Sequence, residues 1–77
     1  MTDDIHTLDA LGLLCPLPVL KARKRLQKLA IGAQLTMLAD DPAAIVDVPL
    51  FCMEAGHVLV SCSDKDGVQA YVIRKAG

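Results

Sequence analysis

Cys15 is the residue whose sequence neighbours most favour a reactive side chain. It stands where a loop should give way to a helix, and Pro16 and Pro18 follow it. A proline in the first turn of a helix loses no hydrogen bond, and its fixed φ starts the helix. The backbone N–H groups of that turn and the positive end of the helix dipole favour a thiolate. The pattern predicts a rigid, exposed sulfur with a pKa below that of a free cysteine, although a buried, unreactive cysteine after Leu13 and Leu14 is the ordinary alternative.

The other cysteines and the two histidines give weaker signals. Cys52 shares the apolar stripe of an expected helix, and Cys62 alternates with apolar residues along an expected strand, so we expect both in the core. His6 and His57 show no pairing with Cys15 that would supply a general base, which argues against acyl transfer. Three cysteines without a repeated CxxC spacing predict neither a disulfide framework nor a zinc site, so we expect no metal and no cofactor.

A lone activated thiolate is sufficient for sulfur transfer. The thiolate attacks the sulfane sulfur of a donor persulfide, and the donor thiolate leaves, as in thiol–disulfide exchange. An acceptor protein then repeats the step. Two other functions stay open: a non-catalytic regulatory or interaction module, and a redox switch in which Cys15 pairs with another cysteine.

A basic cluster follows Cys15 and contains no acidic residue: Lys21, Arg23, Lys24, Arg25 and Lys28. These cations could steer an acidic partner protein toward the sulfur, although a solvated helix face is the more common meaning of such a run. The net charge is -1, and the chain has one Tyr and one Phe. Because single strands need aromatic platforms on which bases stack, a direct nucleic-acid partner is not expected.

The elements that would hold these residues follow from apolar periodicity and turn residues. We expect a strand at 6–10, a helix from Pro16 to Gly32 and a strand at 34–39. A second helix follows, capped by Asp41, with a kink or break at Pro49 and an end at Gly56. Strands at 57–63 and 68–75, joined by a turn at 64–67, complete the chain. Right-handed crossovers and a final hairpin make the sheet mixed. The expected fold is a two-layer α/β sandwich, βαβαββ, with a four-stranded mixed sheet and two helices on one face.

The chain as a whole suits one small domain, residues 1–77. An apolar share of 53% can build a compact core without a metal or disulfides. The opening Met1-Thr2-Asp3-Asp4 lacks the basic start and apolar stretch of a secretory signal, and no membrane segment is expected. Free thiols fit a reducing compartment. We therefore expect a cytoplasmic protein that is a monomer when free.

Several segments resemble the TusA/SirA-like sulfur-carrier family, over nearly the whole chain. They are residues 8–19 with the Cys-Pro-x-Pro motif, Asp-Asp-Pro at 40–42, Asp-Val-Pro-Leu-Phe-Cys at 47–52 and Ile-Arg-Lys at 73–75. The resemblance implies a two-layer α/β fold with a four-stranded mixed sheet, and a persulfide on Cys15. Cys52 matches a cysteine common in relatives, but the catalytic role maps only to Cys15.

The resemblance also implies partners. Family members similar to this chain take sulfur from a cysteine desulfurase or a rhodanese-type donor. They pass it to relay proteins that serve tRNA 2-thiouridine formation, molybdenum-cofactor assembly or sulfur oxidation. Leu14 and Leu17 stand where the tRNA relay pattern commonly has a basic and an acidic residue. Both flank the sulfur, so they bear on which partner is used.

Overall fold

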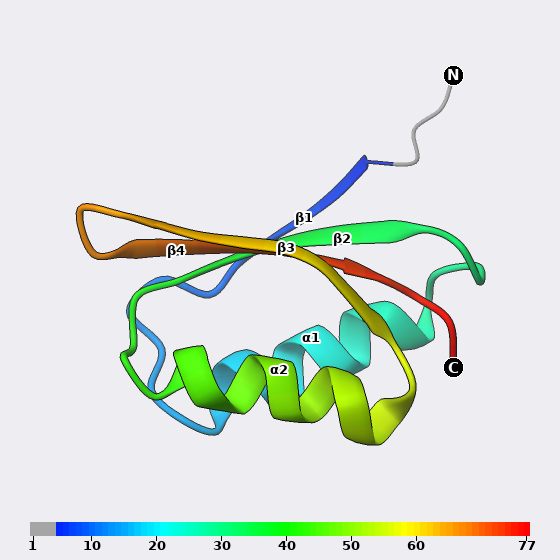
Figure 1. Ribbon diagram of the computed structural model, residues 1–77, viewed down its shortest axis with the longest axis horizontal. Helices are drawn as coiled ribbons and strands as arrows, with labels where there is room; N and C mark the ends of the chain where they lie inside the picture. The colour runs from blue at the N-terminus through cyan, green and yellow to red at the C-terminus, as the bar shows by residue number, and fades with distance from the viewer. Residues whose placement is uncertain (1–4) are drawn as a thin grey trace.

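The computed structural model describes residues 5–77, in which two helices and four strands follow the order expected from the sequence (Figure 1). They are β1 (Ile5–Asp9), α1 (Leu17–Gln27), β2 (Gln34–Ala39), α2 (Ala44–Ala55), β3 (Val58–Lys65) and β4 (Val68–Arg74). The predicted fold class is confirmed.

The four strands form one mixed sheet in the order β1-β2-β4-β3. β1 and β2 are parallel, whereas β4 pairs antiparallel with both β2 and β3. Both helices lie on one face of the sheet, as expected (Figure 1). Because β1 and β2 are parallel, the loops that follow them leave from the same edge, and the candidate site forms there.

The core lies between the sheet and the helices. Alternate residues of the central strands point into it, as the period of two in a strand requires. The sheet contributes Leu35, Met37 and Ala39 from β2 and Tyr71 and Ile73 from β4, and the helices contribute Ala22, Leu26, Val48, Phe51 and Cys52. Cys52 is 2% exposed, which confirms its predicted core position.

The β3–β4 hairpin turns where the sequence predicts, although over fewer residues. Asp66 and Gly67 both have positive φ, 54° and 83°, and they form a two-residue turn of the kind that matches strand twist. The Gly67 N–H donates to Asp64 Oδ1 at 3.2 Å. The strands therefore continue into the residues expected to be loop.

The second helix differs from the expectation at two places. Pro42 was expected as its first residue, but α2 begins at Ala44, and Asp41 Oδ1 accepts from the Ala43 N–H at 3.1 Å in the turn before it. A kink or break was expected at Pro49, but α2 runs through it as one helix. Pro49 and Ile45 both lie on the exposed side, where water can reach the carbonyl that has lost its donor.

The predicted core position of Cys62 is wrong, because its side chain is exposed. β3 is an edge strand, and its register with β4 shifts between Leu59 and Ser61. The tip of the hairpin reaches past the start of α2 (Figure 1), and Cys62 borders an open hollow that it shares with Ile45 and Pro49 of α2. Alternation alone therefore misplaces Cys62.

Candidate functional site: Cys15 and the hollow between the helices

Cys15 lies in the loop between β1 and α1, with its side chain exposed. Pro16 is the N-cap residue, and α1 begins at Leu17. The first helical hydrogen bond runs from the Leu20 N–H to the Pro16 carbonyl at 3.1 Å. Pro18 is buried against the core and anchors the first turn. The two prolines thus fix the backbone on one side of the sulfur.

Asp41 fixes the backbone on the other side. Its Oδ2 accepts from the Cys15 N–H at 2.7 Å, while its Oδ1 holds the turn before α2. Its main-chain carbonyl accepts from the buried Gln69 side chain at 3.1 Å. Asp40 adds a parallel link, because its Oδ1 accepts from the Gly12 N–H at 3.0 Å. The loop that carries the sulfur is therefore tied to the loop after β2.

The sulfur borders a hollow of about 180 Å³ between α1 and α2. The wall on the side of α1 comprises Cys15, Pro16, Val19 and Arg23, and the wall on the side of α2 comprises Asp47, Leu50, Phe51 and Glu54. The guanidinium carbon of Arg23 lies 5.6 Å from the centre of the Phe51 ring, within cation–π range. The sulfur is therefore accessible from the open side of this hollow.

The expected lowering of the Cys15 pKa is wrong, because the structure raises it. The leading cause is the Asp47 carboxylate, to which the thiol can donate a hydrogen bond. Partial desolvation and the negative charges of Asp47 and Asp41 act in the same direction. Carboxylates favour the thiol over the thiolate because two negative charges repel each other.

The helix terminus does not reverse this effect. The Leu17 N–H donates to the Leu14 carbonyl at 2.8 Å, and Pro18 has no N–H to donate. Cys15 also precedes the N-cap, so it lies outside the first turn, where the dipole acts most strongly. The local sequence therefore misleads about the charge state of the sulfur.

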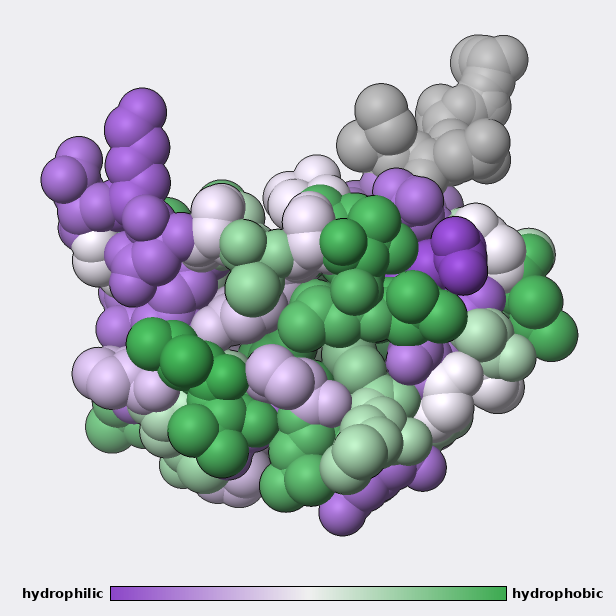
Figure 2. Space-filling model, viewed as in Figure 1, coloured by the Kyte–Doolittle hydropathy of each residue, from purple (hydrophilic) through white to green (hydrophobic). Residues whose placement is uncertain are grey.

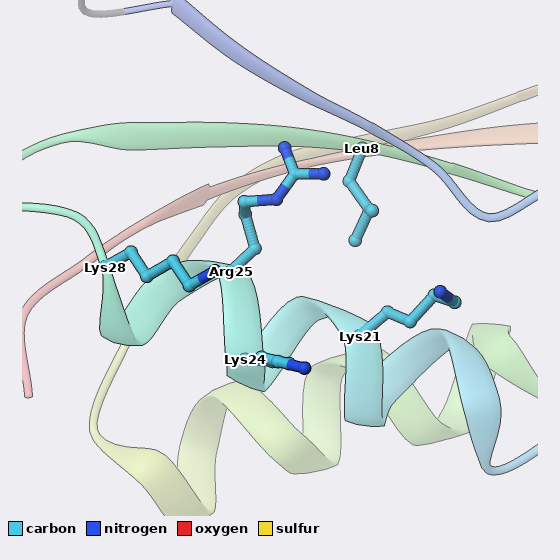
Figure 3. Close-up of a pocket in the computed structure, with 5 residues that line it drawn as sticks. All are labelled: Leu8, Lys21, Lys24, Arg25 and Lys28. Carbon is cyan, nitrogen blue, oxygen red and sulfur yellow. The ribbon is translucent and has the colours of Figure 1, made fainter.

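The basic cluster divides into two parts in space. Arg23 belongs to the hollow beside Cys15. The other four cations, Lys21, Lys24, Arg25 and Lys28, line a separate hollow of about 120 Å³ together with Leu8 of β1 (Figure 3). Arg25 rises from α1 toward β1, and its Nη1 donates to the Thr7 carbonyl at 3.1 Å (Figure 3). The sequence predicted one basic helix face, but in the helix Arg23 points toward a different hollow from the other four cations.

Exposed apolar side chains lie beside the sulfur, next to the charged side chains of the hollow. Leu14 is 69% exposed and Leu17 is 45% exposed beside Cys15. The outer side of α2 adds Val46, Leu50 and Met53. Apolar residues gather over α2 on the face shown in Figure 2. An exposed sulfur amid apolar surface is suited to contact with another protein.

Comparison with known proteins places this site in a family. The family model described as sulfurtransferase TusA matches residues 6–75. The chain belongs to the TusA family. Sulfur carrier protein TusA of Pseudomonas entomophila is 46% identical, over 97% of this chain and 96% of that protein. A candidate sulfur carrier protein of Neisseria meningitidis serogroup B is 47% identical, over 90% of this chain and 93% of its own length.

A solved structure agrees with this assignment. The crystal structure of a SirA-like protein from Desulfitobacterium hafniense has a TM-score of 0.81 and 32% identity, and it covers 95% of this chain and 99% of that chain. The recognised resemblance to the TusA/SirA-like family is thereby confirmed. In residues 5–77 there is no helix long and apolar enough to cross a membrane.

Sequence reasoning assigned no role at the sulfur to Asp47 and gave Asp41 only the role of a helix cap. Both lie in the segments that carry the resemblance to the TusA family, at 40–42 and 47–52. That placement was a signal, but it could not show which atoms the carboxylates face. The structure brings both carboxylates to Cys15.

Proposed function

We propose that this chain accepts sulfane sulfur as a persulfide on Cys15 and passes it to an acceptor protein. The observation that supports the proposal is an exposed thiol at the edge of an open hollow, on a backbone held by Asp41 and two prolines. Membership of the TusA family, with its sulfur-carrier relatives, supports the same function.

The chemistry consists of two displacements. The Cys15 thiolate attacks the outer sulfur of a donor persulfide, a new S–S bond forms, and the donor cysteine leaves as a thiolate. The acceptor thiolate then attacks the outer sulfur on Cys15, and the Cys15 thiolate leaves. No electrons enter or leave, and no cofactor is needed for either step.

The donor in this proposal is a cysteine desulfurase or a rhodanese-type protein, and the acceptor is a relay protein. The relay serves tRNA thiolation, molybdenum-cofactor assembly or sulfur oxidation. Residues 1–77 act as one domain, in the cytoplasm and as a monomer when free. The sulfur travels between proteins, so direct contact with nucleic acid or membrane is not part of the proposal.

Docking uses two surfaces in this proposal. The exposed apolar residues around Cys15 contact the partner next to the sulfur. The cations of α1, Lys21, Lys24, Arg25 and Lys28, steer an acidic partner from the side of β1, and Arg23 contacts it at the hollow. Complementary charge raises the association rate more than it raises final affinity.

The test loads the reduced protein with a cysteine desulfurase and cysteine and then measures its mass. The unsubstituted chain should gain one sulfur atom, and Cys15→Ser should gain none. Cys62→Ser is the matched control, since Cys62 is also an exposed cysteine. Loading of Cys15→Ser together with failure of Cys62→Ser would refute the assignment. A loss of two hydrogens without added sulfur would instead indicate a redox switch.

A further inference from the structure

The charged groups around the Cys15 thiol are predominantly acidic. Asp47 and Glu54 of α2 border the hollow that contains the thiol, and Arg23 borders it from α1. Asp41 holds the Cys15 N–H from the loop after β2. Among these groups, Asp47 acts most strongly on the thiol, and Asp41 acts through its charge. The thiol therefore faces carboxylates although a cation lies in the same hollow.

We propose that Asp47 is a positioning residue for sulfur transfer, whose carboxylate faces Cys15 across the hollow and makes the carrier hold its sulfane sulfur until an acceptor takes it. This inference rests on the proposed function, because it assigns a role in the same transfer. Asp47 takes no part in the bonds that form and break. It acts only through the basicity of the Cys15 sulfur.

The physical reason lies in the two displacements. A more basic thiolate is a stronger nucleophile toward a donor persulfide and a poorer leaving group when an acceptor attacks. The carboxylate beside Cys15 raises the pKa of its thiol, so the Cys15 thiolate leaves more slowly when another thiolate attacks the outer sulfur. A Brønsted coefficient of about 0.4–0.5 changes nucleophilic reactivity about threefold for each pH unit of difference in thiol pKa.

The same effect protects the loaded carrier from small thiols. Glutathione can attack the outer sulfur of an exposed persulfide, which forms a glutathione persulfide and releases the Cys15 thiolate. When Cys15 is a poor leaving group, this loss is slow. The hollow is open, so slow loss comes from the chemistry of the sulfur and not from burial.

The matched variants are Asp47→Asn and Glu54→Gln. Both replace a carboxylate at the hollow with an amide of similar shape, but only Asp47 acts on the thiol. The first readout is the rate of alkylation of unloaded protein by iodoacetamide against pH. We expect the midpoint to fall in Asp47→Asn and to stay at the parent value in Glu54→Gln. A purely structural role of Asp47 would not move this midpoint.

The second readout is the release of sulfur from loaded protein to reduced glutathione, followed by mass. Asp47→Asn should release sulfur faster than the parent, because its Cys15 thiolate is a better leaving group. At a pH above both midpoints, where the thiol is deprotonated in both proteins, the variant should load more slowly, about threefold for each pH unit by which the midpoint falls. Equal midpoints and equal release rates in the parent and Asp47→Asn would overturn the inference. A lower alkylation midpoint and faster sulfur release in Glu54→Gln, equal to those of Asp47→Asn, would also overturn it. If the parent never loads sulfur, the proposed function fails, while the alkylation midpoint still decides whether Asp47 acts on Cys15.

Discussion

Replacing Asp41 with alanine should destabilise the fold as well as the site. The carboxylate accepts two backbone N–H groups, from Cys15 at 2.7 Å and from Ala43 at 3.1 Å. A hydrogen bond to a charged group contributes about 1.5–3 kcal/mol. Since Cys15 is exposed, water can hydrogen-bond to its N–H when the carboxylate is removed, which offsets part of the loss. We therefore expect the free energy of unfolding to fall by about 2–3 kcal/mol in total. For a domain of this size that loss lowers the melting temperature by roughly 8–24 °C.

The measurement is urea unfolding at pH 7, followed by far-ultraviolet circular dichroism. Asp40→Ala is the matched control, because the neighbouring carboxylate accepts one backbone N–H, from Gly12 at 3.0 Å. We expect about half the loss for that variant, and an intermediate loss for Asp41→Asn, which keeps one acceptor oxygen. If Asp41→Ala is no less stable than Asp40→Ala, Asp41 does not tie the two loops together in solution.

Three further predictions concern charge, the hairpin and pH. Replacing both Lys24 and Lys28 with glutamate should slow sulfur transfer at low salt and limiting donor. The difference in rate from the parent should shrink as the Debye length falls from about 10 Å at 0.1 M to about 3 Å at 1 M. Equal transfer rates in the variant and the parent at low salt would refute steering. Gly67→Ala should reduce stability by about 1–2 kcal/mol in thermal melting, because its φ of 83° suits glycine; an unchanged melting temperature would contradict this. Desolvation and the charge of Lys75 lower the pKa of His57 in the folded protein. The stability that neutral His57 contributes is therefore fully present above the unfolded pKa of about 6.5. It is lost as the pH falls from about 6.5 toward the folded pKa. His57→Gln should lose less stability than the parent between pH 7.5 and 5.5, and identical losses would show that His57 is not responsible.

The parts of the fold that depend on neighbours in sequence were predictable. The strand at 34–39 has the expected bounds, and the hairpin turn lies where Asp66 and Gly67 favour it. The position of Cys15 before a helix followed from Pro16 and Pro18. In each case the cause is a backbone preference or an apolar period that acts over a few residues.

The properties that depend on distant residues were not predictable from local pattern. Cys15 and Asp41 are 26 positions apart, and the sequence does not show that this carboxylate would hold the backbone of the sulfur. The direction of the Cys15 pKa was therefore misjudged, since it depends on Asp47 in the other helix. Cys62 was misjudged because a register shift and an edge position override strict alternation.

The position of β4 in the sheet has a consequence for how the chain is made. β4, residues 68–74, pairs with both β2 and β3, so the sheet has no continuous set of strands until these late residues are available. On a ribosome, β1, β2 and both helices emerge earlier and must wait for β4 to leave the exit tunnel. During that interval the core has no Tyr71 or Ile73 to cover it. The nascent chain therefore exposes the Cys15 loop before the fold that positions it exists.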